Sequence, residues 1–133
     1  MSQSTKYTFL AHTIVTVIMG IPLLLIPGSF LPVFGWAEEG IDPLITRIFG
    51  AAVLAMAWSS YRGWKAIDWD QVKIVVEAEA VFTILAVIGM LRHIIGFSRP
   101  FEIWINNWPA GVWLIFAIFA IFAIAWIVAL RRK

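Results

Sequence analysis

Cysteine is absent from this chain of 133 residues. Disulfide bridges, thiolate metal sites and cysteine nucleophiles are therefore excluded. Charge is scarce as well, because charged residues make up 14% of the chain, against about 25% in a typical soluble domain. Hydrophobic residues instead make up 62%. This composition excludes a disordered chain and an ordinary soluble enzyme.

Motifs that announce a reaction are also lacking. The sequence has no His-Glu-x-x-His zinc motif, no glycine-rich phosphate loop and no histidines and carboxylates at metal-ligand spacing. Its basic residues flank apolar runs, so nothing indicates a nucleic-acid partner. The sequence therefore indicates no catalytic residue, no cofactor-binding residue and no metal site. A non-enzymatic protein is favoured over an enzyme.

Long apolar runs dominate what is present. A helix needs about 20 mostly apolar residues to cross the hydrocarbon core of a membrane. Four runs approach or reach that length, at residues 7–26, 44–61, 72–91 and 110–130. Because lipid cannot satisfy backbone polar groups, each run is expected to be a helix. We predict an all-α polytopic membrane protein, with residues 1–133 forming one four-transmembrane-helix bundle.

Lysine and arginine are distributed unequally between the two ends of the predicted spans. Seven lie at the end shared by both termini and three at the other end. The positive-inside rule then places both termini in the cytoplasm and favours the cytoplasmic (plasma) membrane. On the outer side, residues 27–36 are too apolar for water and are expected in the interface. Residues 100–107 are predicted to form a short interfacial helix before the last span, as an aromatic anchor or a lid.

Three predicted helices carry a stripe of polar or small residues. Residues three or four positions apart share one face of a helix. The stripes are Thr8, His12 and Thr16 in the first span, Arg47, Ala51, Ala55 and Ser59 in the second, and Glu79, Thr83, Ala86, Met90 and His93 in the third. The fourth span has no such stripe. We expect three stripes to face a common axis and the fourth helix to close the bundle with bulky side chains.

The polar residues fall at two depths. His12 and Glu79 each lie six residues inside a lysine at the cytoplasmic end, or about 9 Å of helix. Ser59 lies three residues before Arg62 at that same end. His12, Ser59 and Glu79 are therefore expected to meet, with Thr83 lining the same cavity. Arg47 and His93 belong to an outer polar cluster, with His93 about 21 Å from Glu79 along the helix.

His12 and Glu79 admit two interpretations. A buried carboxylate is costly unless it is paired, and an imidazole close by lowers that cost. The pair is therefore either a site that binds a proton, a cation or a small ligand, or a polar clamp that fixes helix packing. By contrast, Glu77 lies four residues after Lys73, and we expect these two to form an interfacial ion pair.

Arg47 also admits two interpretations. It either pairs with an acidic side chain of the first outer loop or binds a lipid phosphate or another anion bidentately. The available acids are Glu38, Glu39 and Asp42.

The second span, RIFGAAVLAMAWSSYRGW at residues 47–64, resembles the DoxX-like group of small four-helix membrane proteins. The resemblance is carried by an arginine, a glycine three residues later, and small and apolar residues leading to a basic turn. It implies a four-helix bundle that acts as a partner subunit, as accessory subunits of membrane oxidoreductases do in that group. Only Arg47 and Gly50 are carried over, and neither has an assigned role.

Three functions follow as hypotheses. The first is a non-enzymatic accessory or scaffolding subunit, which assembles with a membrane protein partner through its helices. The second is a small homo-oligomeric transporter, channel or lipid-binding bundle that uses His12, Ser59, Glu79 and Thr83. The third is a membrane enzyme acting on a lipid-soluble substrate. All three involve membrane lipids, and no cofactor is indicated.

Overall fold

The computed structural model describes residues 1–35, 41–95 and 110–131, and in the second range it describes side chains as far as Arg92. Four long helices make up most of it: α1 (Gln3–Leu25), α3 (Pro43–Lys65), α4 (Lys73–Ile95) and α6 (Ala110–Arg131). All four are long and apolar enough to span a membrane. This confirms the predicted all-α, four-helix architecture of an integral membrane protein. The helix predicted at residues 100–107 lies outside the described residues.

Local sequence signals set where the helices begin. The Ser2 hydroxyl caps α1 by accepting a hydrogen bond from the Thr5 amide at 3.2 Å. The Asp42 carboxylate caps α3 by accepting from the amides of Leu44 and Ile45, at 2.9 and 3.1 Å. Pro43 follows this cap at the first helical position, where its missing N–H costs nothing. The predicted boundary at Pro43 is therefore confirmed.

The segment after α1 folds into two short helices, α2 (Pro27–Phe30) and η1 (Leu31–Phe34). Gly35 ends η1 with a φ of 87°, a left-handed conformation that glycine adopts without steric cost. This segment packs against the beginning of α6, because a side chain added at Gly111 would collide with the backbone of Phe34. The apolar turn after the first span is thus part of the bundle.

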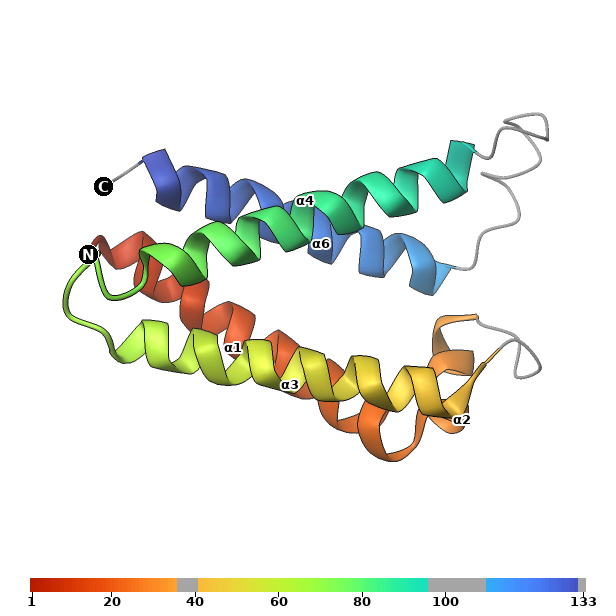
Figure 1. Cartoon of the computed structure of the whole chain (residues 1–133). Helices are drawn as coiled ribbons and strands as arrows, with labels where there is room; N and C mark the ends of the chain where they lie inside the picture. Colours follow the sequence, from red (N-terminus) through yellow and green to blue (C-terminus); the bar gives the residue numbers. More distant parts are fainter. Residues whose placement is uncertain (36–40, 96–109, 132–133) are drawn as a thin grey trace.

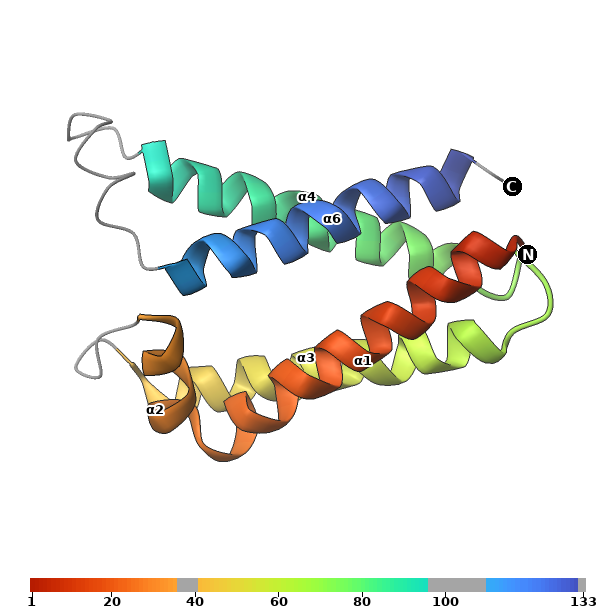
Figure 2. The ribbon, with the colours of Figure 1, turned by 180° about the vertical axis from the view of Figure 1, so that it is seen from behind.

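The long helices form two pairs, α1 with α3 and α4 with α6 (Figure 1). Seen from behind, the two pairs form two layers, and both chain ends lie at the end where α3 leads into α4 (Figure 2). We call this the terminal end, where α1 begins and α6 ends. The opposite end, which carries α2 and η1, is the distal end. An even number of consecutive spans returns the chain to the end at which it began, which is why both termini lie together.

Glycines hold α1 and α3 together. A Cβ added at Gly50 would lie 2.6 Å from the Leu24 amide nitrogen and 2.9 Å from the Leu23 carbonyl carbon. At the terminal end, Gly63 lies directly against the ring of Phe9. Small residues let membrane helices approach until their backbones touch. The α1–α3 pair is therefore closely packed at several points along its length.

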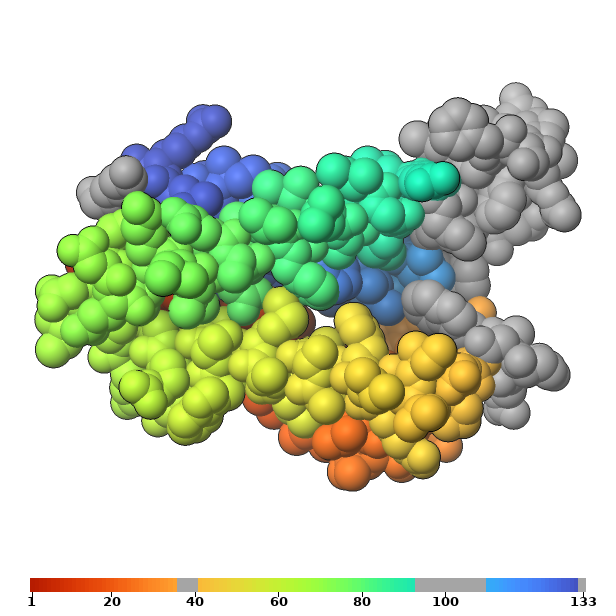
Figure 3. Space-filling model, viewed as in Figure 1, coloured from red at the N-terminus to blue at the C-terminus, as the bar shows by residue number. Residues whose placement is uncertain are grey.

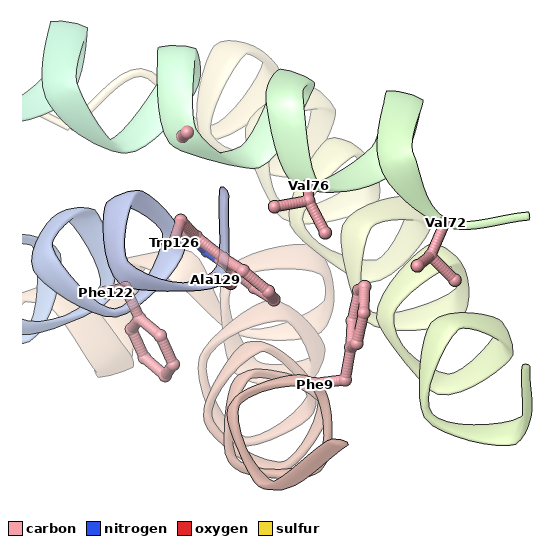
Figure 4. Packing of buried hydrophobic residues seen from close by; sticks show 7 residues of the cluster. Phe9, Val72, Val76, Phe122, Trp126 and Ala129 are labelled. Atoms are coloured by element: carbon pink, nitrogen blue, oxygen red, sulfur yellow. The ribbon is translucent and has the colours of Figure 1, made fainter. Parts of the chain in front are cut away.

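An apolar core joins the two layers at the terminal end. It combines residues of α1, α4 and α6 with one from the turn before α4 (Figure 4): Phe9, Val72, Val76, Ala80, Phe122, Trp126 and Ala129. The rings of Phe9 and Trp126 meet edge to face, with centroids 5.0 Å apart. Trp126 is fully buried. The large side chains with which the fourth span was expected to close the bundle, Phe122 and Trp126, lie in this core.

The face of α3 that turns inward differs from the predicted one. Its buried residues are Gly50, Val53, Ala57, Ser60 and Gly63. Arg47, Ala51 and Ala55 of the predicted stripe are exposed, so the prediction was wrong for these three, whereas its fourth member, Ser59, is half-buried and lies beside Glu79. The reason is physical, because the glycine-bearing face permits the closest approach of α1 and is therefore the face that packs.

Candidate functional site: a buried histidine and glutamate

His12 lies on the buried face of α1, one turn from Phe9 and one turn from Thr16. Its side chain is 5% exposed. The ring atom Nδ1 shares a hydrogen bond of 2.8 Å with the hydroxyl of Ser60 on α3. That bond fixes the orientation of the imidazole and turns its other nitrogen, Nε2, toward α4.

Glu79 of α4 faces His12 across the bundle. Its Oε2 atom lies 3.7 Å from Nε2 of His12, and its side chain is 4% exposed. This separation is an ion-pair distance and exceeds that of a hydrogen bond. The structure thus brings His12 and Glu79 together as their depths predicted.

Ser59 supplies a second contact to the carboxylate. Its hydroxyl lies 3.5 Å from Oε1 of Glu79 and 2.9 Å from the carbonyl oxygen of Met56. One hydroxyl has a single proton to donate, so the shorter bond to the carbonyl competes with the one to Glu79. The structure therefore places Ser59 beside Glu79, as expected, but holds it there weakly.

Two aromatic rings of α6 close the site. Phe122 and Trp126 both meet the imidazole of His12 edge to face, with centroid separations of 4.7 and 5.5 Å. Both residues are buried. These rings keep water from the pair on the side of α6, so its charges lie in a low-dielectric surrounding.

Thr83 lies one turn beyond Glu79 and is 1% exposed. Its hydroxyl donates to the carbonyl oxygen of Glu79 at 2.8 Å, and the carbonyl oxygen of Ala80, at 3.2 Å, shares the same proton. Thr16 does the same in α1, donating to the carbonyl of His12 at 2.6 Å. Thr83 therefore lies on the expected face, but its hydroxyl is satisfied by the backbone of its own helix.

The carboxylate of Glu79 is only partly satisfied. Within the described part of the chain, Oε2 is buried and accepts no hydrogen bond, and Nε1 of the buried Trp126 donates none. A buried polar atom without a partner costs about 1–3 kcal/mol. The site thus has hydrogen-bonding capacity that the described residues leave unused.

Most of the predicted outer polar cluster lies outside the described residues. Arg47 is exposed near the distal end of α3. Its expected partners Glu38 and Glu39, and the side chain of His93, lie outside the described residues. The carboxylate of the third expected partner, Asp42, caps the helix. Lys73 and Glu77 form the expected exposed ion pair, with 3.9 Å between Nζ and Oε1.

Sequence reasoning missed Ser60, Phe122 and Trp126. Ser60 had a detectable signal, because Ala57, Ser60 and Gly63 are spaced three residues apart and share a face. Phe122 and Trp126 had none, since the last span is apolar on every side and no periodicity marks its inner face.

The residues of the site do not form a metal centre. Among residues 1–35, 41–92 and 110–131, no three histidine or acidic side chains lie close enough to hold a metal ion. The chain matches no model of a known protein family, and comparisons with curated proteins and with solved structures give no match either.

Proposed function

We propose that the protein is a ligand-binding membrane bundle in which His12 and Glu79 share one proton and hold the polar group of a small molecule. The observation that carries the proposal is the Oε2 atom of Glu79. It is buried, lies 3.7 Å from Nε2 of His12 and accepts no hydrogen bond from the described residues. An ionisable group inside a span is retained at an energetic cost, and such groups usually serve a function.

The chemistry of the pair suits a binding role. With one proton between them, the two side chains carry no net charge, whichever of them holds the proton. An isolated charge in the hydrocarbon core is far more costly than such a pair. The pair can donate one hydrogen bond and accept another, so it can hold a hydroxyl or carbonyl group without adding charge.

A purely structural clamp is the competing interpretation. Interhelical polar contacts in membranes fix packing when their donors and acceptors satisfy one another. Here the contacts to Glu79 are long, at 3.5 Å from Ser59 and 3.7 Å from His12. A clamp selected for packing would have little reason to leave Oε2 without a donor, and this favours the binding role.

The accessory-subunit hypothesis and the DoxX-like resemblance remain predictions. The exposed apolar side chains of α6, such as Leu114, Ile121 and Ile124, fit lipid as well as they fit a protein partner. We further propose that the terminal end faces the cytoplasm, on the strength of the lysine and arginine bias.

Native mass spectrometry of the protein, extracted gently from its own membrane, tests the binding role. Wild type is compared with Glu79→Gln and with the matched control Glu77→Gln, which alters an exposed carboxylate two residues away. We expect wild type and Glu77→Gln to retain a small molecule that Glu79→Gln loses.

A different spectrum would overturn the proposal. If all three proteins carry the same bound mass, or none, the Glu79 carboxylate is not the binding group. A defined protein partner retained by all three would support the accessory-subunit hypothesis in its place.

A further inference from the structure

The two faces of α3 border different surroundings. One face packs on α1, and the surface on the other side is hollowed between α3 and α4, with α6 visible behind it (Figure 3). We call this hollow, between the facing sides of the two helices, the α3–α4 groove. It opens sideways, toward the region that lipid occupies around a spanning bundle.

The contact of Ser59 shows which side of α3 lines the groove. Because the Ser59 hydroxyl reaches Glu79, the side of α3 that carries Ser59 faces α4. Met56 and Ala52 precede Ser59 by three and seven residues, so they extend the same side toward the distal end. Met56 is half-buried and Ala52 is exposed.

The wall on α4 follows from Glu79 in the same way. Thr83, Ala86 and Met90 lie four, seven and eleven residues later on one face. Burial decreases along this face, from Thr83, which is buried, to Ala86 and Met90, which are half-buried. Eleven residues of helix correspond to about 16 Å, so the groove is long enough for an extended apolar chain.

The buried end of the groove is polar and the rest is apolar. Glu79 is 3% exposed and its Oε2 lacks a hydrogen-bond donor among the described residues. Lys73, a cation of the same helix, is exposed, and its Nζ lies 3.9 Å from Glu77. An anionic head group at Glu79 would therefore add an uncompensated charge to a low-dielectric site, and a cationic one would first have to displace the proton that His12 and Glu79 share; both are costly.

From this arrangement we infer that the α3–α4 groove admits an uncharged amphiphile from the lipid phase. Its hydroxyl group donates a hydrogen bond to the carboxylate of Glu79, and its apolar chain lies between Ala52 and Ala86. The inference rests on the proposed function and adds to it the class of ligand and the route of entry.

Photolabelling in bilayers tests the route and the ligand class together. The probe is a long-chain primary alcohol with a diazirine in its chain, dissolved in vesicles that contain the whole protein. Labelled positions are mapped by peptide mass spectrometry. We expect saturable labelling of α3 and α4 near Met56 and Ala86, with competition by an unlabelled alcohol of the same chain length.

Two tryptophan substitutions provide the matched comparison. Ala52→Trp fills the groove, whereas Ala117→Trp adds the same bulk to an exposed position of α6, on the side opposite Trp126. We expect Ala52→Trp to lower saturable labelling at least about tenfold, which corresponds to about 1.4 kcal/mol, and Ala117→Trp to leave it unchanged. Ala86→Leu narrows the opposite wall, and we expect it to lower labelling in the same direction.

Several results would overturn the inference. They are labelling spread evenly over lipid-facing positions, labelling equal in Ala52→Trp and Ala117→Trp, and equal competition by a fatty amine or a fatty acid. If native mass spectra still show a ligand that depends on Glu79, the proposed function stands and only the route and the ligand class fail. If Glu79→Gln alters neither measurement, both proposals fail.

Discussion

Helix α3 lies between two of the other long helices, α1 and α4, and small residues lie on both of these sides. Toward α1, Gly50 and Gly63 let the backbone of one helix touch its partner. Toward α4, Ser59 reaches Glu79 and Ala52 lies on the same side of α3, yet the surface between these helices stays hollowed (Figure 3). Small residues therefore permit close approach without enforcing it.

The two sides of α3 differ because α3 packs tightly against α1, whereas α4 packs mainly against α6. The α1–α3 pair is closed by glycine, and the α4–α6 pair is joined by larger side chains such as Phe82 and Phe119, whose ring centroids are 5.9 Å apart. Each pair is a unit, and the two units meet around His12 and the apolar core.

The largest expected effect lies where the two pairs meet. His12→Phe keeps the bulk of the ring but leaves the Glu79 carboxylate without its partner. Removing one member of a buried ion pair costs about 3–5 kcal/mol. We expect a loss of stability in this range, measured by reversible unfolding in bicelles.

A second substitution distinguishes the stability lost by leaving Glu79 unpaired from the stability lost through altered packing. His12→Phe combined with Glu79→Leu removes both polar groups, and we expect the double variant to recover most of the lost stability. A double variant no more stable than His12→Phe would show that the loss does not come from the unpaired Glu79 carboxylate.

Substitution of a glycine tests the closely packed interface between α1 and α3. Gly50→Ala places a methyl group 2.6 Å from the Leu24 amide nitrogen, and overpacking of this kind costs about 1–3 kcal/mol. In Gly89→Ala the new methyl meets nothing within 4 Å, and the change adds a better helix former. We expect Gly50→Ala to lower the unfolding free energy by about 2 kcal/mol and Gly89→Ala to leave it unchanged or higher. Equal losses of unfolding free energy would mean that the backbone of α1 does not limit the space at Gly50.

The two interfaces are compared directly by alanine positions on opposite sides of α3. Ala57 is 3% exposed, and Ala57→Leu is expected to destabilise the protein by about 1–2 kcal/mol through overpacking. Ala52→Leu enters the α3–α4 groove, and we expect a change below about 0.5 kcal/mol. If thermal unfolding shows similar losses for both, the groove has no spare room.

The smallest effect is expected at the surface. Glu77 pairs with Lys73 at 3.9 Å, and both side chains are about half exposed. Exposed pairs of this kind contribute about 0.3–0.5 kcal/mol. We expect Glu77→Gln to change the unfolding free energy by no more than this, and a larger loss would mean that the terminal end depends on its surface charges.

Much of the fold follows from the sequence because apolar run length and proline positions act locally. The depths of His12 and Glu79 also follow, since each can be counted from a lysine at the same end of a helix. The inward face of α3 does not follow, because two small-residue faces lie side by side on it. Periodicity shows which residues share a face, but only the fit of Gly50 against Leu24 decides which face packs on α1.

The contact between Phe34 and Gly111 has a mechanical consequence. The α1–α3 pair is attached to the α4–α6 pair twice, through the apolar core at the terminal end and through η1 on α6 at the distal end. Two attachments prevent the pairs from opening like a hinge. We therefore expect the groove to behave as a slot of fixed length. Such a slot would discriminate between guests by the length of their apolar chain.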